Sequence, residues 1–204
     1  CEILAALGAG TFVIIDGRYS DPETNVPLVD PLLDAAGWAD FMEETNRLAT
    51  IATKDYGLRA AFHPHSDTHV EFQPEIDRFL AESDPELISI CFDTGHHAYC
   101  GGDPIAFMRR HHERVSYLHL KNIDAKLRAR VDRENISYVR AVAQGVFVEP
   151  DRGAVDFEEF RAVLDEVGFA GVAVVEQDMY PAPPDRPLGV ATRTREYLRA
   201  HGYG

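Results

Sequence analysis

Residues 87–97 read LISICFDTGHH, an apolar run that closes on an acid and leads into a turn with two histidines. The first seven residues are nearly continuous in hydrophobicity and lack the alternation of a half-exposed strand. Such a run is typical of a parallel strand covered on both faces. We therefore predict a buried strand over 87–93 that presents Asp93 where it ends.

Four more apolar runs bounded by turn residues predict strands of the same kind. They are TFVIID (11–16), LRAAFHPH (58–65), VSYLHLK (115–121) and VAVVEQD (172–178). Helical patterns lie between or after the strands, at 34–55, 75–82, 104–113, 157–167 and 190–200. Alternating strands and helices predict βα units with right-handed crossovers, as in a doubly wound sheet or a (β/α)8 barrel.

The connection after the first predicted strand decides between these two folds. It reads DGRYSDPE and lacks the GxGxxG turn of a dinucleotide-binding fold, so the α/β TIM barrel is favoured. A full barrel has eight strands in typically about 250 residues, and only five are predicted here. We expect a partial barrel in a single domain over 1–204. Residues 17–33 and 122–155 are predicted to be loops at the functional rim, with a short helix near 134–143.

Composition excludes several classes of function. The chain has 204 residues, 45% of them hydrophobic, and no segment is apolar enough to span a membrane. Twenty Lys and Arg against 34 Asp and Glu leave a net charge of −14, which disfavours nucleic acid as a partner. Three cysteines without CxxC spacing predict reduced thiols and a cytoplasmic location.

Ionisable residues follow four of the five predicted strands. They are His63 and His65, Asp93 and His96, His119 and Lys121, and Glu176 and Asp178. The carboxyl ends of barrel strands converge on one rim, and mixed carboxylates and imidazoles suit a divalent cation such as Mn, Co, Mg or Zn. Each has a plainer interpretation: Asp93 as a turn former, His119 as a core histidine. Glu176 is harder to dismiss, because burying an unpaired carboxylate is costly.

Several of these segments together resemble a known family. FHPHSDTHVEFQPEIDRFL, FDTGHHAYCGGDPIAFMRRHHERVSYLHLKN, GVFVEPDRGAVDFEEF and VVEQD resemble the inosose dehydratase branch of the xylose isomerase-like sugar isomerase/epimerase and AP-endonuclease superfamily. The resemblance covers nearly the whole chain. It implies a (β/α)8 barrel in which this chain lacks the first three βα units.

The resemblance also implies a ligand set for one divalent metal ion, with Mn or Co expected ahead of Mg, Zn or Fe. Asp93, His119 and Glu176 match three of the family's ligands. Relatives carry Glu as a fourth ligand where this chain has His63, and we expect Glu71 to replace it in preference to His63. Two further residues match substrate-contacting positions of the family, and with His63 they form the predicted substrate-binding set: His63, His96 and Lys121.

The activity implied is a lyase that dehydrates a polyhydroxy ketone such as inosose by way of an enolate. Proton transfer is assigned to a residue among Glu71, His65 and Glu176, without a choice between them. One rival is a metal-dependent ketose isomerase or epimerase, which shares enolate formation. Another is a non-catalytic sugar-binding or partner-dependent fragment, because a five-strand arc exposes two sheet edges. We therefore expect either a homo-oligomer or a longer polypeptide whose first part covers those edges.

Overall fold

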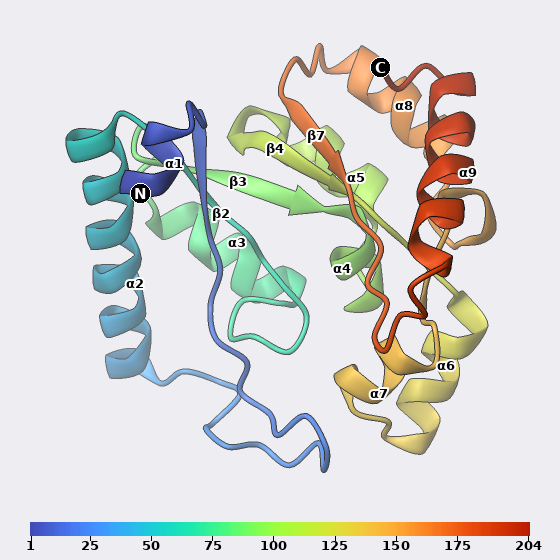
Figure 1. The fold of residues 1–204 in the computed structure, drawn as a ribbon. Coiled ribbons are helices and arrows are strands. Elements are labelled where there is room, and N and C mark those ends of the chain that lie inside the picture. The colour runs from blue at the N-terminus through green and yellow to red at the C-terminus, as the bar shows by residue number, and fades with distance from the viewer.

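Five parallel strands form one curled sheet in the order β1-β2-β3-β4-β7 (Figure 1). The computed structural model describes residues 1–204, and the strands are β1 (Thr11–Ile14), β2 (Arg59–Phe62), β3 (Ile88–Asp93), β4 (Val115–Leu120) and β7 (Val172–Val175). Each strand pairs in parallel with the strand before it along the sheet. A doubly wound sheet would reverse its strand order at a switch point, whereas this order never reverses. The topology is that of a partial TIM barrel, as predicted.

Helices connect the strands and cover the outer side of the sheet (Figure 1). They are α2 (Ala35–Thr50, continued by a π-helical turn Ile51–Asp55), α3 (Gln73–Glu82), α5 (Pro104–His111), α8 (Phe157–Glu166) and α9 (Arg186–Ala200). All five correspond to predicted helices. The chain also has shorter segments, among them α1 (Glu2–Ala6), α4 (Thr94–Tyr99) and 3-10 turns at His112–Arg114 and Pro150–Arg152.

Side-chain caps explain where two of these helices begin. Asp103 accepts hydrogen bonds from the backbone N–H groups of Ile105 and Ala106, and Pro104 takes the first helical position of α5. Asp156 caps α8 in the same way. Gly168 follows α8 with φ of +66°, a left-handed conformation that glycine adopts without strain.

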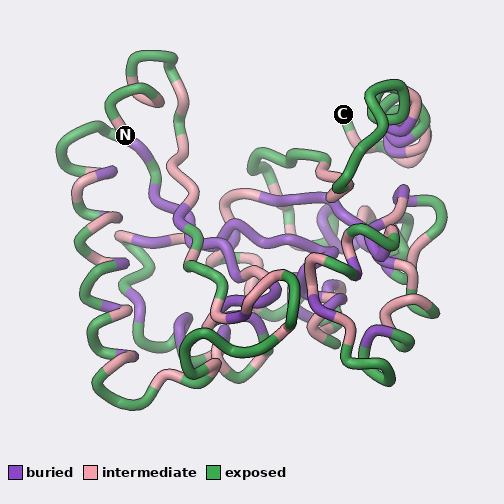
Figure 2. The backbone as a smooth tube through the Cα atoms, turned by 60° about the horizontal axis from the view of Figure 1, so that its bottom comes forward, coloured by how far each residue is buried: buried purple, intermediate pink, exposed green.

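The core lies between the sheet and its outer helices. Phe62 on β2 stacks on Phe79 of α3 with ring centroids 4.3 Å apart, and Phe92 on β3 stacks on Phe107 of α5 at 4.2 Å. All four rings are buried. Figure 2 shows buried stretches running through the middle of the molecule, while the helices alternate between buried and exposed stretches. Burial of these aromatic faces orders the sheet and so fixes where its carboxyl ends lie.

The segment 122–155 contains more structure than predicted. The short helix predicted near 134–143 is present as the second of two helices. The first, α6 (Ala125–Glu134), was not predicted, and it ends at Asn135, whose left-handed backbone (φ 48°) closes it. A second helix, α7 (Tyr138–Ala143), then starts at Ser137, whose side chain accepts from the N–H of Arg140. Flanking them, β5 (Asn122–Ile123) pairs with β6 (Phe147–Val148) in a separate antiparallel pair. This segment lies at the carboxyl ends of the strands (Figure 1).

The two outer strands of the sheet each have a single neighbour. β1 pairs only with β2, and β7 pairs only with β4. On β7, Val172, Val174 and Val175 are 54%, 37% and 46% exposed, which is unusual for a strand of this composition. No helix in the chain has both the length and the apolar character needed to cross a bilayer.

Candidate metal centre

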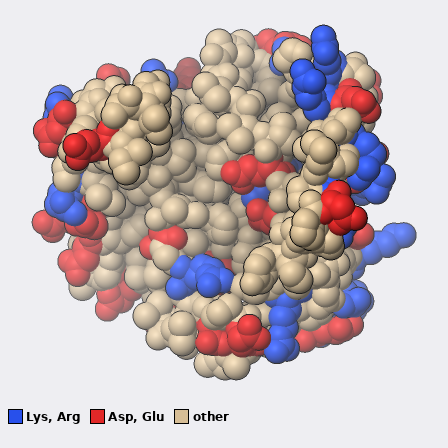
Figure 3. Space-filling model, in the orientation of Figure 1, with Lys and Arg blue, Asp and Glu red and all other residues tan.

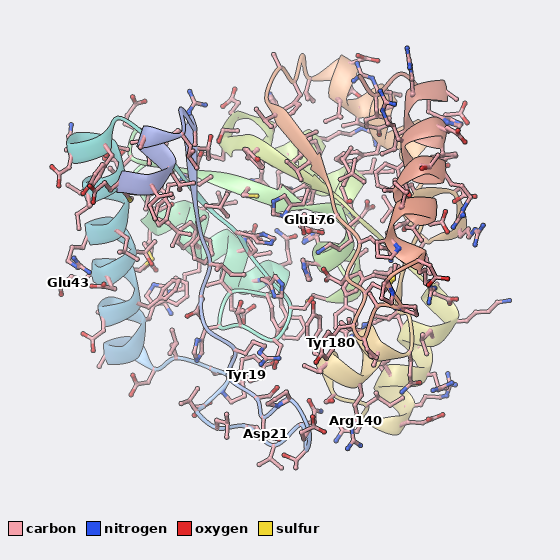
Figure 4. All side chains as sticks on the ribbon, in the orientation of Figure 1. Tyr19, Asp21, Glu43, Arg140, Glu176 and Tyr180 are labelled. Carbon is pink, nitrogen blue, oxygen red and sulfur yellow. The ribbon has the colours of Figure 1, made fainter.

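Three predicted ligands meet at the carboxyl ends of adjacent strands. Asp93 at the end of β3 is in register with His119 on β4, and Glu176 follows β7 directly. One ligand atom from each lies within 4.8 Å of the others, and Nδ1 of His119 is 3.5 Å from both Asp93 Oδ2 and Glu176 Oε2. Figure 4 labels Glu176 in the middle of the concave side of the sheet.

Two of these three residues have buried donor atoms that lack hydrogen-bond partners. Asp93 Oδ2 and His119 Nδ1 are buried atoms with no hydrogen bond. The other oxygen of Asp93 accepts from the N–H groups of Gly95 and His96, which fixes the carboxylate at the start of α4. Buried polar atoms without partners are rare in folded proteins. A carboxylate pair with an imidazole is a donor set that a divalent cation satisfies, so these residues fit a metal ion.

His63 stands beside this group. It follows β2, its ring centroid lies 4.7 Å from that of His119, and its Nδ1 is a further buried atom without a hydrogen bond. Its ring nitrogen lies within 4.8 Å of ligand atoms of Cys91 and His119. Burial lowers the pKa of His63 to about 3, so the imidazole is neutral and its lone pair is available at physiological pH.

Glu71 is held elsewhere, and the structure does not bring its carboxylate to the three-residue group. One oxygen accepts a 2.5 Å hydrogen bond from the hydroxyl of Tyr19, and the other accepts a 2.6 Å bond from the N–H of Asp67. The thiol of Cys100 lies 3.7 Å from the second oxygen. Burial raises the pKa of Glu71, and these donors oppose that effect. All the near neighbours of this carboxylate are therefore hydrogen-bond donors from the loops.

Lys121 is almost completely buried among three carboxylates. Its Nζ lies 2.9 Å from Glu176 Oε2, 3.1 Å from Asp178 Oδ2 and 3.3 Å from Asp93 Oδ2. Burial alone lowers the pKa of a lysine, but the three carboxylates outweigh it, and the pKa of Lys121 is raised. The side chain is therefore an ammonium ion. Figure 3 shows acidic atoms next to basic ones in the hollow where Figure 4 labels Glu176.

Asp93 responds to the same charges. Burial raises the pKa of a carboxyl group, but the proximity of His96 and of the Lys121 ammonium outweighs burial and holds the pKa of Asp93 well below its usual range. The carboxylate is ionised at any pH at which the protein would work. An ionised acid and a neutral imidazole are the protonation states that metal binding requires.

His65 and His96 stack against each other beside the group, with ring centroids 3.7 Å apart. His65 Nδ1 lies 2.7 Å from the carbonyl oxygen of Ser66, an acceptor, so Nδ1 carries the proton and Nε2 keeps its lone pair. Burial lowers the pKa of His65 and keeps the ring neutral. His65 is therefore a half-buried imidazole with a free basic nitrogen.

Two residues of this site were not predicted. Tyr138 on α7 donates from its hydroxyl to Asp178 Oδ2 at 3.1 Å, and Phe147 on β6 places its ring 5.2 Å from Lys121 Nζ. Both lie in the segment 122–155, which shows no strand-end pattern. Asp178 was noted as a strand-end acid but not placed in the site, and its pairing with Lys121 depends on the register of β4 and β7.

Comparison with known proteins agrees with this geometry. The family model described as "Xylose isomerase-like TIM barrel" matches residues 1–201. The chain belongs to the xylose isomerase-like TIM barrel family. It is 31% identical to the inosose dehydratase of Geobacillus thermodenitrificans over 97% of its own length, and it spans 67% of that relative.

Solved structures share the fold. A xylose isomerase domain protein from Planctomyces limnophilus matches with a TM-score of 0.72 at 19% identity, over 98% of this chain and 62% of that one. The IolI protein, whose structure has a bound zinc atom, matches with a TM-score of 0.65 at 14% identity, over 97% and 65% of the two chains. The chain thus spans about two thirds of the length of the proteins it matches.

Proposed function

We propose that this chain carries the metal-dependent active site of a lyase that dehydrates a polyhydroxy ketone such as inosose. The observation that carries the proposal is the convergence of Asp93, His119 and Glu176, in which Asp93 Oδ2 and His119 Nδ1 are buried atoms without a hydrogen bond. The 31% identity to an inosose dehydratase supports dehydration ahead of isomerisation or epimerisation. A cytoplasmic location is part of the proposal, and the three free cysteines support it.

We assign the metal ligands to Asp93, His119, Glu176 and His63. His63 replaces Glu71 in this set because it has an unpartnered Nδ1 and a ring nitrogen within 4.8 Å of a ligand atom of His119, whereas Glu71 is engaged with Tyr19 and Asp67. When bound, a divalent ion would act as a Lewis acid toward the ketone oxygen and make the adjacent C–H bond more acidic. Mn or Co remains our expectation for its identity, and zinc in the IolI structure shows that this fold accommodates a divalent ion.

His65 is the proposed base among the three candidates for proton transfer. Its Nε2 is free and neutral, while Glu71 is saturated by donors and Glu176 is paired with the ammonium of Lys121. His65 would take the proton from the carbon next to the ketone. The resulting imidazolium can return that proton to the departing β-hydroxyl. One C–H and one C–O bond break, a C=C bond forms, and water leaves.

Substrate hydroxyls would be bound by the groups around this base. Lys121, Asp178 and Tyr138 form a connected set beside Glu176, with one ammonium, one carboxylate and one phenol. Such a mixture can donate to and accept from several hydroxyls of a polyol, which fits a sugar or inositol ketone as the partner. His96 contacts Lys121 as well, with its Nε2 2.9 Å from Lys121 Nζ.

Product analysis tests the reaction. Incubation with inosose and Mn²⁺ should give a product lighter by one water, with loss of the α-hydrogen. A product of unchanged mass, with solvent deuterium incorporated at the α-carbon, would establish the isomerase or epimerase alternative. Binding of the ketone without either change would establish the non-catalytic sugar-binding alternative.

Calorimetric titration with Mn²⁺ tests the ligand set. His63→Ala should weaken metal binding by roughly 10-fold or more, because it removes a direct ligand. Glu71→Gln should leave the affinity within about threefold, because its carboxylate does not face the ion. The opposite ranking would restore Glu71 as the fourth ligand and remove His63 from the set.

A further inference from the structure

A continuous run of polar contacts leads away from the ligand group and ends at Glu71. We call it the Glu71–Lys121 chain, and its members in order are Lys121, His96, Ser66, Cys100 and Glu71. The successive distances are 2.9 Å from Lys121 Nζ to His96 Nε2, 3.1 Å from His96 Nδ1 to Ser66 Oγ, 3.5 Å to Cys100 Sγ and 3.7 Å to Glu71 Oε2.

All members of the chain except the partly exposed Cys100 are shielded from water. Lys121, His96 and Ser66 are 1%, 2% and 0% exposed, and Glu71 is 7% exposed. Each polar group must therefore find its partner within the chain or its immediate neighbours, since an unpaired buried donor costs about 1–3 kcal/mol. The direction of each hydrogen bond is consequently determined by which members can only donate and which can only accept.

Lys121 fixes the direction at one end. An ammonium group has three donors and no acceptor, so Nε2 of His96 must accept from it. A ring nitrogen that accepts from an ammonium carries no proton, so His96 is a neutral imidazole. Its single ring proton is then on Nδ1 and is donated to the hydroxyl oxygen of Ser66.

Glu71 fixes the same direction at the other end. A carboxylate only accepts, and Tyr19, Asp67 and Cys100 all donate to it. The thiol proton of Cys100 therefore points at Glu71, which leaves its sulfur to accept from Ser66. The two ends agree, and every proton in the chain points from Lys121 toward Glu71.

We propose that Glu71 is a positioning residue that acts through this chain and, together with Lys121 at the other end, holds His96 in one tautomer and Lys121 in one orientation. The carboxylate is the terminal acceptor that lets each link donate in one direction only. His96 then presents a lone pair to Lys121 and holds the ammonium against Glu176 and Asp178 at the site. This role rests on the proposed function, because the orientation of Lys121 matters for catalysis only if substrate binds beside it.

The tautomer of His96 can be measured without metal or substrate. In protein labelled with nitrogen-15 histidine, wild-type His96 should show a protonated Nδ1 and an unprotonated Nε2. Ser66→Ala removes the acceptor of Nδ1, and Glu71→Gln replaces the terminal acceptor with an amide that also donates. Both variants should convert the single tautomer into a mixture. A wild-type ring protonated at Nε2, or a tautomer unchanged in both variants, would overturn the proposal.

A matched pair at Cys100 guards against a variant that fails to fold. Cys100→Ser keeps one donor and one acceptor and should preserve the tautomer, whereas Cys100→Ala should lose it. Ser83→Ala is the control for the loss of a buried serine hydroxyl outside the Glu71–Lys121 chain. Ser83 ends α3, and its hydroxyl accepts from Arg114. If the two Cys100 variants showed the same His96 tautomer, Glu71 would not control that tautomer.

Steady-state kinetics complete the test. Cys100→Ala and Glu71→Gln should lower kcat by roughly 10-fold while Cys100→Ser restores it, as expected when a supporting partner of a site residue is lost. Metal affinity should stay within about threefold in all three variants. If inosose is not dehydrated but the tautomers behave as described, the chain stands and the proposed function fails. A normal kcat in Cys100→Ala with an altered tautomer would overturn the catalytic role of the chain.

Discussion

Each histidine near the site has a different state because its neighbours differ. His65 keeps a lone pair on Nε2 because a carbonyl accepts its Nδ1 proton, while His96 keeps one because an ammonium donates to it. His63 lacks a hydrogen bond at Nδ1 and lies beside His119. Three imidazoles that look alike in the sequence thus serve as proposed base, support and ligand.

Glu176→Gln tests the ligand role most directly. The amide oxygen is a weaker ligand than a carboxylate, so Mn²⁺ affinity should fall by roughly 10-fold or more and turnover should be lost. The protein should stay folded with a loss of about 1–3 kcal/mol of unfolding free energy, because the carboxylate pairs with the buried ammonium of Lys121 at 2.9 Å. Glu43→Gln on α2, remote from the site in Figure 4, is the control. Normal turnover in Glu176→Gln would assign this residue to structure.

His97 should make the stability of the protein depend on pH. Its ring packs against both Phe92 and Phe107 and makes no hydrogen bond, and burial lowers its pKa to about 4. The unfolded chain binds a proton at this residue below about pH 6.5, but the native protein does not until about pH 4. The unfolding free energy should therefore fall as pH drops through this window, by up to about 1.4 kcal/mol per pH unit.

His97→Gln isolates this contribution. Urea unfolding at pH 7 and pH 5 should show a shallower loss of stability in the variant than in the wild type. An identical pH dependence in the two proteins would mean that His97 is already protonated in the folded state, or solvated there.

The short helix α4 illustrates how an element serves the site. It begins directly after β3, with Asp93 as its N-cap, and its second residue, Gly95, packs against Lys121. A Cβ at Gly95 would lie 2.5 Å from Lys121 Cγ and 3.0 Å from its backbone carbonyl carbon. Glycine is required because the helix approaches β4 too closely for any side chain.

Gly95→Ala should therefore displace Lys121. We expect a loss of about 1–3 kcal/mol of unfolding free energy from overpacking, and a large fall in kcat. Gly10→Ala is the matched control, because a Cβ there meets no atom within 4 Å. Wild-type stability and turnover in Gly95→Ala would show that α4 can move away without consequence for Lys121.

At the scale of the whole molecule, the sheet is an arc with two open edges. A cleft of about 790 Å³ lies between the edge strand β7 and α9, lined by apolar side chains that include Val175, Leu164, Val190 and Leu198. Strand edges and apolar clefts of this kind are normally covered. We propose that another copy of the chain, or a longer polypeptide, covers them.

Size-exclusion chromatography with native mass spectrometry tests this expectation. An assembly of copies should elute above the 22.8 kDa of one chain, and Val174→Lys on the exposed side of β7 should dissociate it. A stable, monodisperse monomer that tolerates Val174→Lys would show that the edges need no cover.

Much of this architecture follows from local sequence. Continuous apolar runs predicted all five strands, because strands buried on both faces must be apolar throughout. Asp103 and Asp156 marked the starts of helices, since a short side chain that accepts from backbone N–H groups acts within four residues. Asp93, His119 and Glu176 were identifiable because the ends of parallel strands share one edge. The short helix near 134–143 was predicted and is α7, but α6 before it was missed, because the left-handed residue Asn135 that separates the two helices gives no periodic signal.

The remaining relations depend on contacts between residues far apart in the chain. The sequence determined that Glu71 is an acid beside a strand end, but the fold determined that its partners are Tyr19 and Cys100. The fold also determined that His63 stands next to His119, and that Lys121 is buried among three carboxylates from the ends of β3 and β7. Hydrophobicity and capping act over a few residues and can be read along the chain. Distances across the curled sheet depend on strand register and curvature, and these exist only once the core has packed.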